Sequence, residues 1–340
     1  MRFGLALPHY DTSLAGAPAS WDGVARVARA AEHSGWDSVW VSDHLFLDWG
    51  KYGGPADVQG SLECWTTMSA LAAVTERVRI GSLALCNDLR NPALVAKMAA
   101  TLDVLSGGRV DVGLGAGWYE PEYRAAGIPF ERAGTRIRRL GEAAEIAGRM
   151  LAGEELTFAG RHYRVDAAIC TPQPVQRPRP PIWVGGKGDL LLETAVRVAD
   201  GWNFSWLGSF ETYRERTATA DRLCEKAGRD PASLRRSVGA YVVTGADRAD
   251  LDARAERVAA RTPAGVLGAG PVSLDELGAS RVVGTTGEVV ERLGGLADLG
   301  VEEVVVTLGV LPFQVADEED VELFGREVAA ALQGEDGGTR

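Results

Sequence analysis

The strongest constraint on the fold is a repeated alternation of short apolar runs and longer helix-like segments. In the first half of the chain the apolar runs are Phe3–Leu7, Ser38–Val41, Val78–Leu85 and Arg109–Leu114, and each is followed by a segment with helical periodicity. Strands that alternate with helices at this spacing predict a parallel sheet with right-handed crossovers.

The same rhythm resumes in the second half of the chain. Four further strand candidates follow there: Ile182–Val184, Gly201–Ser205, Val238–Thr244 and Val304–Leu308. Eight parallel strands with helices between them fit a closed (β/α)8 TIM barrel of the α/β class. An open, doubly wound sheet is the architecture that competes with it.

The alternation breaks once, between the two halves. The stretch from about residue 154 to 181 is rich in proline and contains the β-like pieces Thr157-Phe158 and His162–Val165. These pieces predict an insertion that carries a small hairpin. The glycine-rich stretch Thr262–Val283 predicts a mobile loop near the site.

The length of the chain bears on its domain organisation. Because α/β barrels of this size occur as one domain, we expect a single TIM-barrel domain over residues 1–332. The polar residues 333–340 predict a disordered tail.

Composition argues against several kinds of partner. Aspartate and glutamate number 47 against 36 lysines and arginines, a net charge of −11, and no basic block stands out. That balance argues against nucleic acid or an anionic membrane surface. The N-terminal apolar stretch is too short for a signal peptide, and no apolar run approaches the roughly 18 residues of a membrane helix. We therefore expect a cytoplasmic protein.

The cysteines and histidines form no metal-binding pattern. The four cysteines lie far apart without a CxxC pair, which suits a reducing compartment better than a disulfide framework or a zinc site. The four histidines lack HxH or HExxH spacing. We therefore expect no metal site.

Chemistry in a barrel gathers at the C-terminal ends of the strands. The second predicted strand ends in Ser42-Asp43-His44. A carboxylate beside an imidazole can position a proton donor near neutral pH, so we predict His44 as an acid–base residue. The alternative is that Asp43 caps a turn and His44 is polar surface.

The third predicted strand ends in Leu85-Cys86-Asn87-Asp88. A small polar run here can contact the ring or chain of a cofactor, and a purely structural turn is the alternative. Neither a histidine nor a basic neighbour marks Cys86 as a nucleophile.

The fourth predicted strand runs into Gly113–Trp118, followed by Tyr119-Glu120. The run lacks the last glycine of G-x-G-x-x-G because residue 118 is tryptophan, so we reject a dinucleotide-binding fold. Its glycines allow the backbone to approach a flat ligand closely. Glu120 is a second acid candidate, with helix capping as the alternative.

A glycine-rich turn, Gly185-Gly186-Lys187-Gly188, joins the next strand to a helix. Successive amides at a helix N-terminus, with Lys187 beside them, predict a phosphate site, and a plain tight turn is the alternative. The similar run Gly284–Glu288 predicts a simple helix cap.

In this order, these motifs resemble the luciferase-like monooxygenase superfamily over about residues 1–330. The residues that carry the resemblance are Ser42-Asp43-His44, Leu85–Asn87, Arg90–Pro92, Leu105–Arg109, Gly113–Trp118, Trp183–Gly186 and Ala199–Asn203. Within the superfamily, the run from Cys86 to Trp118 most resembles the branch that uses coenzyme F420, an 8-hydroxy-5-deazaflavin.

The resemblance implies that the deazaflavin lies across the C-terminal mouth of the barrel. Asp43 would lie near its ring and His44 near its reactive face. Ring contacts would come from Cys86 and Asn87, where a bulge with a non-prolyl cis peptide is typical of the branch. Ala116 and Gly117 would line the ring or its side chain. The phosphate would be held by Gly185, Gly186, Lys187 and Gly188.

One departure from the branch bears on the substrate. Its sugar-phosphate dehydrogenases carry glutamate directly after the glycine run, where this chain has Trp118, and Glu120 lies two residues further on. This difference weakens the case for glucose 6-phosphate. The spacing from His44 to Trp49 also differs by one residue. We expect Trp49 and Trp118 to shape the substrate pocket.

The resemblance predicts an oxidoreductase that transfers a hydride between coenzyme F420 and a small organic substrate. His44 would handle the coupled proton, Asp43 would position the imidazole and the cofactor, and Glu120 would be a secondary relay. The alternative is an FMN-dependent monooxygenase that uses O2 and reduced flavin from a partner reductase. A non-catalytic binding barrel is a third hypothesis, disfavoured by the Asp43–His44 pair. Barrels of this family are often dimers, so we expect a homodimer.

Overall fold

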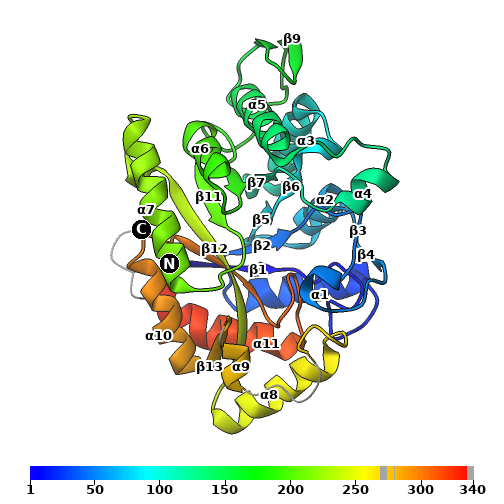
Figure 1. Cartoon of the computed structure of the whole chain (residues 1–340), viewed down its shortest axis with the longest axis vertical. Coiled ribbons are helices and arrows are strands. Elements are labelled where there is room, and N and C mark those ends of the chain that lie inside the picture. The colour runs from blue at the N-terminus through cyan, green and yellow to red at the C-terminus, as the bar shows by residue number, and fades with distance from the viewer. Residues whose placement is uncertain (269–273, 279, 335–340) are drawn as a thin grey trace.

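Eight parallel strands close into a barrel in the computed structural model, which describes residues 1–268, 274–278 and 280–334 (Figure 1). The predicted TIM barrel is therefore confirmed, and the open sheet is excluded. Each strand pairs with its neighbours in chain order, and β1 pairs with both β2 and β14 to close the ring. The barrel strands are β1 (Arg2–Ala6), β2 (Ser38–Val41), β5 (Arg79–Ser82), β7 (Val110–Gly115), β10 (Ile182–Gly185), β11 (Gly201–Phe204), β12 (Arg235–Gly245) and β14 (Glu303–Thr307).

Helices cover the outside of the barrel. They bury small and aliphatic side chains against the strands, as α1 does with Val24, Val27 and Ala31. No helix in the described ranges is long and apolar enough to cross a membrane. The helices are α1 (Trp21–His33), α2 (Cys64–Val74), α3 (Pro92–Ser106), α4 (Glu120–Ala125), α5 (Ala133–Leu151), α6 (Asp189–Val198), α7 (Phe210–Lys226), α8 (Arg248–Arg261), α9 (Leu274–Gly278), α10 (Thr286–Ala297), α11 (Glu318–Leu323) and α12 (Ala330–Gly334), with a π-helical turn, Phe324–Ala329, between the last two.

Local sequence signals set several helix starts. Asn91 accepts a hydrogen bond from the Ala93 amide, and Pro92 occupies the first turn of α3, where its missing N–H costs nothing. At α10 the side chains of Thr285 and Glu288 form a reciprocal capping box. The cap predicted for Gly284–Glu288 is thus confirmed.

The structure differs from the predicted strands at two places. The run Val78–Leu85 is not one strand: it divides into β5 and β6 (Leu85–Cys86), and the Leu83–Ala84 peptide between them is cis. Conversely, β12 is longer than predicted, and its last residues pair outside the ring with β13 (Val282–Thr285).

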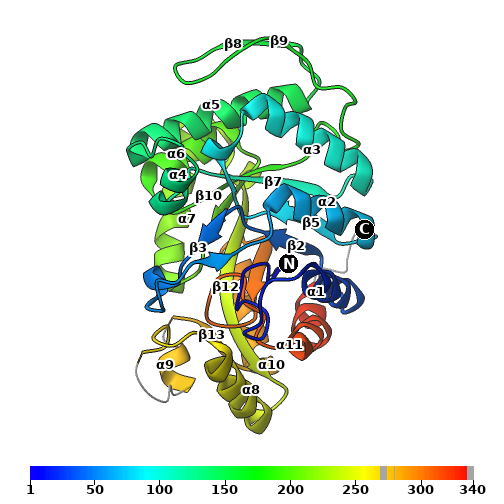
Figure 2. The ribbon, with the colours of Figure 1, turned by 90° about the vertical axis from the view of Figure 1, so that its right-hand side faces the viewer.

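The predicted insertion carries an antiparallel hairpin of β8 (Leu156–Ala159) and β9 (Arg164–Ala168), which projects beyond α5 (Figure 2). A second small pair, β3 (Phe46–Leu47) and β4 (Gln59–Gly60), lies in the long connection after β2.

Two predicted irregular segments contain regular structure. The segment 262–283 includes α9 and the start of β13, while residues 269–273 and 279 lie outside the described residues. At the C-terminus, Gln333 belongs to α12 and its side chain donates to Asp37 at 2.7 Å. Residues 333 and 334 are therefore helical, and 335–340 lie outside the described residues.

Two tryptophans fill the middle of the barrel. Trp40 and Trp183 are buried, with ring centroids 6.5 Å apart at 84°. They fit because neighbouring strands carry glycine: a Cβ on Gly81 would lie 2.3 Å from Trp40, and one on Gly201 would lie 2.2 Å from Trp183. Large and small residues thus alternate around the ring to fill its interior.

Below the tryptophans, at the N-terminal ends of the strands, lies a cluster that we call the polar plug: the buried Ser38, Asp111 and Glu303 with the partly exposed Arg2 and Arg79. Glu303 forms an ion pair with Arg2 at 3.0 Å and accepts hydrogen bonds from the Ser38 hydroxyl and the Trp40 indole. Asp111 pairs with Arg79 and accepts from the Trp183 indole at 3.0 Å. The plug closes this end of the barrel with paired charges.

Candidate functional site

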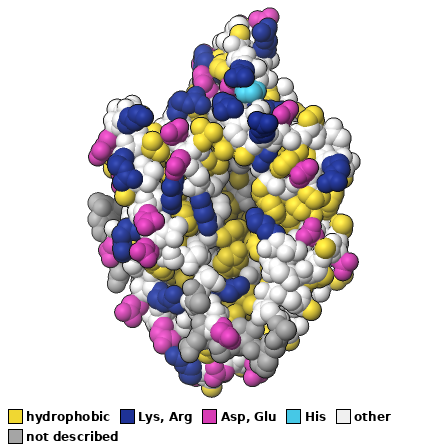
Figure 3. Space-filling model, in the orientation of Figure 1, with side chains coloured by type: hydrophobic (Ala, Val, Ile, Leu, Met, Phe, Trp, Pro, Cys, Tyr) yellow, Lys and Arg dark blue, Asp and Glu magenta, His cyan; other side chains and the backbone are white. Residues whose placement is uncertain are grey.

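A cavity of about 550 Å³ opens at the other end of the barrel, where the strands end. Residues after β1, β2, β5, β7, β10, β11 and β14 line it, together with Tyr241 of β12. The space-filling view shows a hollow with hydrophobic side chains inside and lysine or arginine side chains near its edge (Figure 3). Its size is in the range of small-molecule and cofactor pockets.

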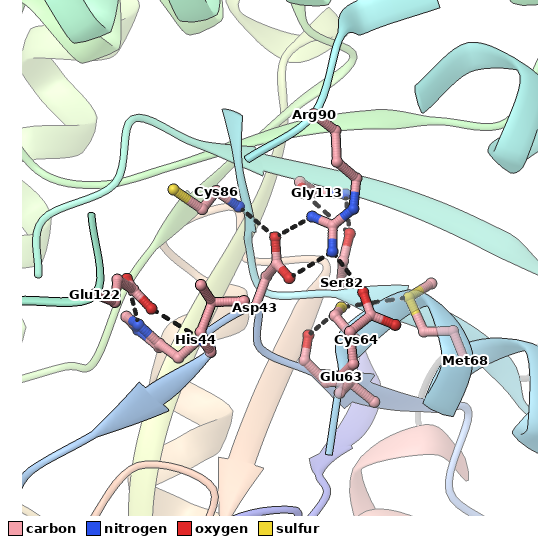
Figure 4. Close-up of polar contacts among 12 residues, drawn as sticks. Asp43, His44, Glu63, Cys64, Met68, Ser82, Cys86, Arg90, Gly113 and Glu122 are labelled. Carbon is pink, nitrogen blue, oxygen red and sulfur yellow. Dashed lines mark hydrogen bonds and ion pairs between the residues drawn. The ribbon is translucent and has the colours of Figure 1, made fainter. Parts of the chain in front are cut away.

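The cavity wall contains a histidine–carboxylate pair. His44 Nδ1 lies 2.9 Å from Glu122 Oε1, and Glu122 Oε2 accepts the Leu45 amide at 2.9 Å (Figure 4). Glu122 is completely buried. Because this carboxylate accepts at both oxygens, Nδ1 of His44 carries a hydrogen. Nε2 has no hydrogen-bond partner among the described residues and is left for a ligand.

Asp43 makes contacts that its position after β2 did not suggest. Arg90 binds its carboxylate with both Nη atoms, at 2.5 and 3.0 Å, and the Cys86 amide donates to it at 2.9 Å (Figure 4). Burial raises the pKa of Asp43, and its hydrogen bonds with Arg90 and the charge of Arg90 oppose that rise. Asp43 lines the cavity but contacts Cys86 and Arg90 rather than His44, so it fixes the loop after β6.

Cys86 lines the cavity as a protonated thiol. Its sulfur lies 3.0 Å from the Tyr123 hydroxyl, and burial raises its pKa to about 12. Gly117 faces the same pair: its φ is +70°, and a Cβ there would lie 1.9 Å from the Tyr123 hydroxyl. Only glycine fits this turn.

The floor of the cavity is made of small residues, which suits a flat ring. Ala84, Gly115 and Gly185 come from three different strand ends. A Cβ on Gly185 would lie 3.7 Å from Ser205 Oγ and 3.8 Å from the Ala84 Cβ. The cis peptide expected near Cys86-Asn87 is found slightly earlier, at Leu83–Ala84.

Two lysines give the cavity positive charge. Lys51 Nζ lies 3.7 Å from the centre of the Trp118 ring, and Lys187 Nζ donates to the Trp206 carbonyl at 2.8 Å. Burial lowers the pKa of both lysines, and the charge of Lys51 lowers that of Lys187 further. Within the described part of the chain no carboxylate forms an ion pair with either one. A bound phosphate would relieve this repulsion.

The structure brings most of the predicted site residues to this one cavity. Those that line it are Asp43, His44, Cys86, Ala116, Gly117, Trp118, Gly185, Gly186 and Lys187.

Four predicted residues do not line the cavity. Glu120 is exposed at the start of α4, Gly188 is the N-cap of α6, and the Asn87 amide donates away from the cavity to the Tyr163 hydroxyl at 3.1 Å. Trp49 is fully buried, and its indole donates to Thr12 at 3.1 Å. Trp49 therefore supports the wall from behind.

Sequence reasoning missed several residues that line the cavity. Glu122 is the clearest case: α4 begins at Glu120, so the helix turns Glu122 and Tyr123 inward and leaves Glu120 in solvent. Tyr10, Tyr52 and Tyr241 were also missed, because isolated tyrosines carry no motif. Among the described residues, no group of three or more histidines, cysteines or acids could hold a metal ion.

Comparison with known proteins places this arrangement in a family. A family model described as luciferase-like monooxygenase matches residues 1–303. The FMNH2-dependent dimethylsulfone monooxygenase of Pseudomonas putida is 30% identical over 330 residues, covering 89% of this chain and 85% of that protein. The F420-dependent glucose-6-phosphate dehydrogenase of Microbacterium testaceum is 36% identical over 201 residues, covering 58% of this chain and 57% of that protein.

A solved structure shares the fold. The F420-dependent secondary alcohol dehydrogenase in complex with an F420–acetone adduct superposes with a TM-score of 0.76 at 21% identity, covering 97% of this chain and 98% of that one. Relatives therefore include both F420-dependent and FMN-dependent enzymes.

Proposed function

The chain belongs to the luciferase-like monooxygenase family, and from that premise we propose that it transfers a hydride between coenzyme F420 and a small organic substrate. The observation that carries the proposal is the His44–Glu122 pair, which leaves Nε2 of His44 free in a cavity that is also lined by the small residues Ala84, Gly115 and Gly185. This arrangement suits a reaction that couples ring redox chemistry to the movement of one proton.

The cavity residues divide between holding the cofactor and holding the substrate. Ala84, Gly115 and Ala116 would contact the ring, and Gly186 with Lys187 would hold the phosphate. Coenzyme F420, when bound, accepts or donates the hydride. His44 Nε2 would take or return the substrate proton, while Glu122 orients the imidazole and stabilises its charged form. Trp118 would shield the reacting groups from water.

The test begins with cofactor titration of the purified protein. We expect F420 to quench tryptophan fluorescence at micromolar concentration and FMN to have no effect in that range. A panel of alcohols and carbonyl compounds would then be screened by F420 absorbance. His44→Ala should lower turnover by about 10²- to 10⁴-fold and leave cofactor affinity unchanged. Loss of F420 binding in that variant would make His44 a structural residue instead.

An FMN-dependent monooxygenase is the second candidate, favoured by the relative that matches 89% of this chain. The same small-residue floor accommodates a flavin ring, and reduced FMN, when bound, would supply the two electrons with which O2 oxygenates the substrate. Micromolar affinity for FMN without affinity for F420, and oxygenated product only when a flavin reductase is added, would favour this candidate over the first.

We further propose that residues 1–332 act as one domain, in the cytoplasm and as a homodimer, on a small-molecule substrate. Sedimentation of the purified chain tests the dimer directly. A partner reductase is needed only under the FMN alternative.

A further inference from the structure

A buried chain of three polar side chains lies beside His44. His9 is completely buried, its Nδ1 lies 2.8 Å from the Leu7 carbonyl oxygen, and its Nε2 lies 3.0 Å from Ser42 Oγ. Ser42 Oγ is also hydrogen-bonded to the Tyr10 hydroxyl. Ser42 and Tyr10 line the cavity, whereas His9 lies behind them. The proposed hydride transfer assigns no role to these three side chains.

The direction of each hydrogen bond among these three side chains follows from His9, the one that lies deepest. A carbonyl only accepts, so Nδ1 of His9 carries a hydrogen. Burial lowers the pKa of His9 to about 4, so the ring is neutral at pH 7 and Nε2 only accepts. The Ser42 hydroxyl must therefore donate to Nε2. Because its one hydrogen is used there, Ser42 accepts from Tyr10, and the Tyr10 hydrogen is committed as well.

Two acceptors consequently face the same space. The Tyr10 oxygen keeps only lone pairs for a ligand. In the neutral form of His44, the form that can take up a substrate proton, Nδ1 donates to Glu122 and Nε2 is therefore an acceptor. The two rings lie side by side, with centroids 6.4 Å apart. One hydroxyl group has one hydrogen and can satisfy only one of these acceptors.

We propose that the cavity selects a substrate with two neighbouring hydrogen-bond donors, a vicinal diol or an amino alcohol. The reacting hydroxyl donates to His44 Nε2, and the second O–H or N–H donates to Tyr10. This inference rests on the proposed function for the role of His44. An ether or carbonyl oxygen in the second position faces the Tyr10 lone pairs, and both oxygens are then buried without a partner.

The test measures binding of matched probes to the F420-saturated protein and, in parallel, to the protein without cofactor. The probes are cis-1,2-cyclohexanediol and cis-2-methoxycyclohexanol, titrated by calorimetry. We expect the diol to bind about tenfold more tightly, and Tyr10→Phe to reduce that preference to within twofold. Tyr163→Phe, which removes a hydroxyl outside the cavity, is the control and should keep the tenfold preference.

A second variant guards against misfolding of the first. Ser42→Ala removes the acceptor for Tyr10 and lets its hydroxyl donate into the cavity, so the preference should vanish or reverse toward the methoxy compound. Equal binding of the two probes to the wild type, or an intact preference in both variants, would overturn the inference. Absence of F420 binding with the diol preference retained would instead overturn only the proposed function.

The tautomer and charge assigned to His9 can be measured directly. In protein labelled with ¹⁵N-histidine, the His9 signals, assigned by their loss in His9→Gln, should report a neutral ring with hydrogen on Nδ1 at pH 7. A hydrogen on Nε2 of His9 would reverse the direction of the hydrogen bonds that join His9, Ser42 and Tyr10, and would refute the inference.

Discussion

The two ends of the barrel both hold charged side chains, yet they use them differently. In the polar plug, Glu303 and Asp111 each have an arginine partner and an indole donor. At the cavity end, His44, Lys51 and Lys187 each keep hydrogen-bonding capacity free beside a hollow. Burial and charge therefore do not mark a site by themselves. Hydrogen-bonding groups left without a partner beside a cavity do mark one.

The largest effect on stability should come from removing one carboxylate of the polar plug. Glu303→Ala leaves Arg2 without its ion-pair partner and the Ser38 hydroxyl without its acceptor, so we expect a loss of about 3–5 kcal/mol in the free energy of unfolding. Urea denaturation measures it. The neighbouring exposed Glu302→Ala breaks only a surface ion pair with Arg235 and should cost under about 1 kcal/mol.

F420 affinity of folded Glu303→Ala protein should match that of the wild type. A large loss of affinity would mean that the two ends are coupled and would break the comparison.

The next effect concerns His9, buried at the cavity end without a charged partner. Its pKa is lowered from 6.5 to about 4, so as the pH falls the unfolded state takes up the proton first. The stability that neutral His9 provides is complete above pH 6.5 and is lost as the pH falls toward 4.

Relative to the non-titrating variant His9→Gln, the wild type should therefore lose about 2 kcal/mol of unfolding free energy between pH 7.5 and pH 5. Urea titrations at the two pH values give this double difference. A difference that does not change with pH would show that His9 titrates alike in both states.

A smaller effect should follow from Glu122→Gln, which keeps the shape of the side chain but removes the charge behind His44. We expect turnover to fall about tenfold with unchanged F420 affinity, because a charge-assisted hydrogen bond is replaced by a neutral one. Glu120→Gln, two residues earlier and exposed, is the matched control and should leave turnover unchanged. Equal losses in the two variants would refute the pairing with His44.

The smallest effect should come from Lys187→Met. Removing one charge beside the proposed phosphate site should weaken F420 binding about fivefold at low salt, and less at high salt, because salt screens a half-exposed charge. Lys226→Met, an exposed lysine at the end of α7, should have no effect. Fluorescence titration at two salt concentrations distinguishes an electrostatic role from a packing role.

Much of the site followed from local patterns. The strand that ends in Asp43 and His44 and the turn at Gly185–Lys187 were predicted, because strand ends and glycine turns are local features of the chain. Glu120 was predicted and Glu122 was missed, because the phase of α4 depends on how the preceding loop, Gly117 to Tyr119, bends around Tyr123. Trp49 was predicted to line the pocket, but the path of its loop is also set by distant contacts. The loop folds back so that the indole donates to Thr12.

The sequence by itself determined the βα alternation, the barrel and the strand ends that carry polar side chains, because periodicity and turn chemistry act over a few residues. Only the tertiary structure decided which of these side chains keep a hydrogen-bonding atom free for a ligand. Arg90, 47 residues from Asp43, occupies that carboxylate, and Glu122, 78 residues from His44, fixes the imidazole. Hydrogen bonds act over about 3 Å and depend on direction, so packing of distant segments, and not composition, sets them.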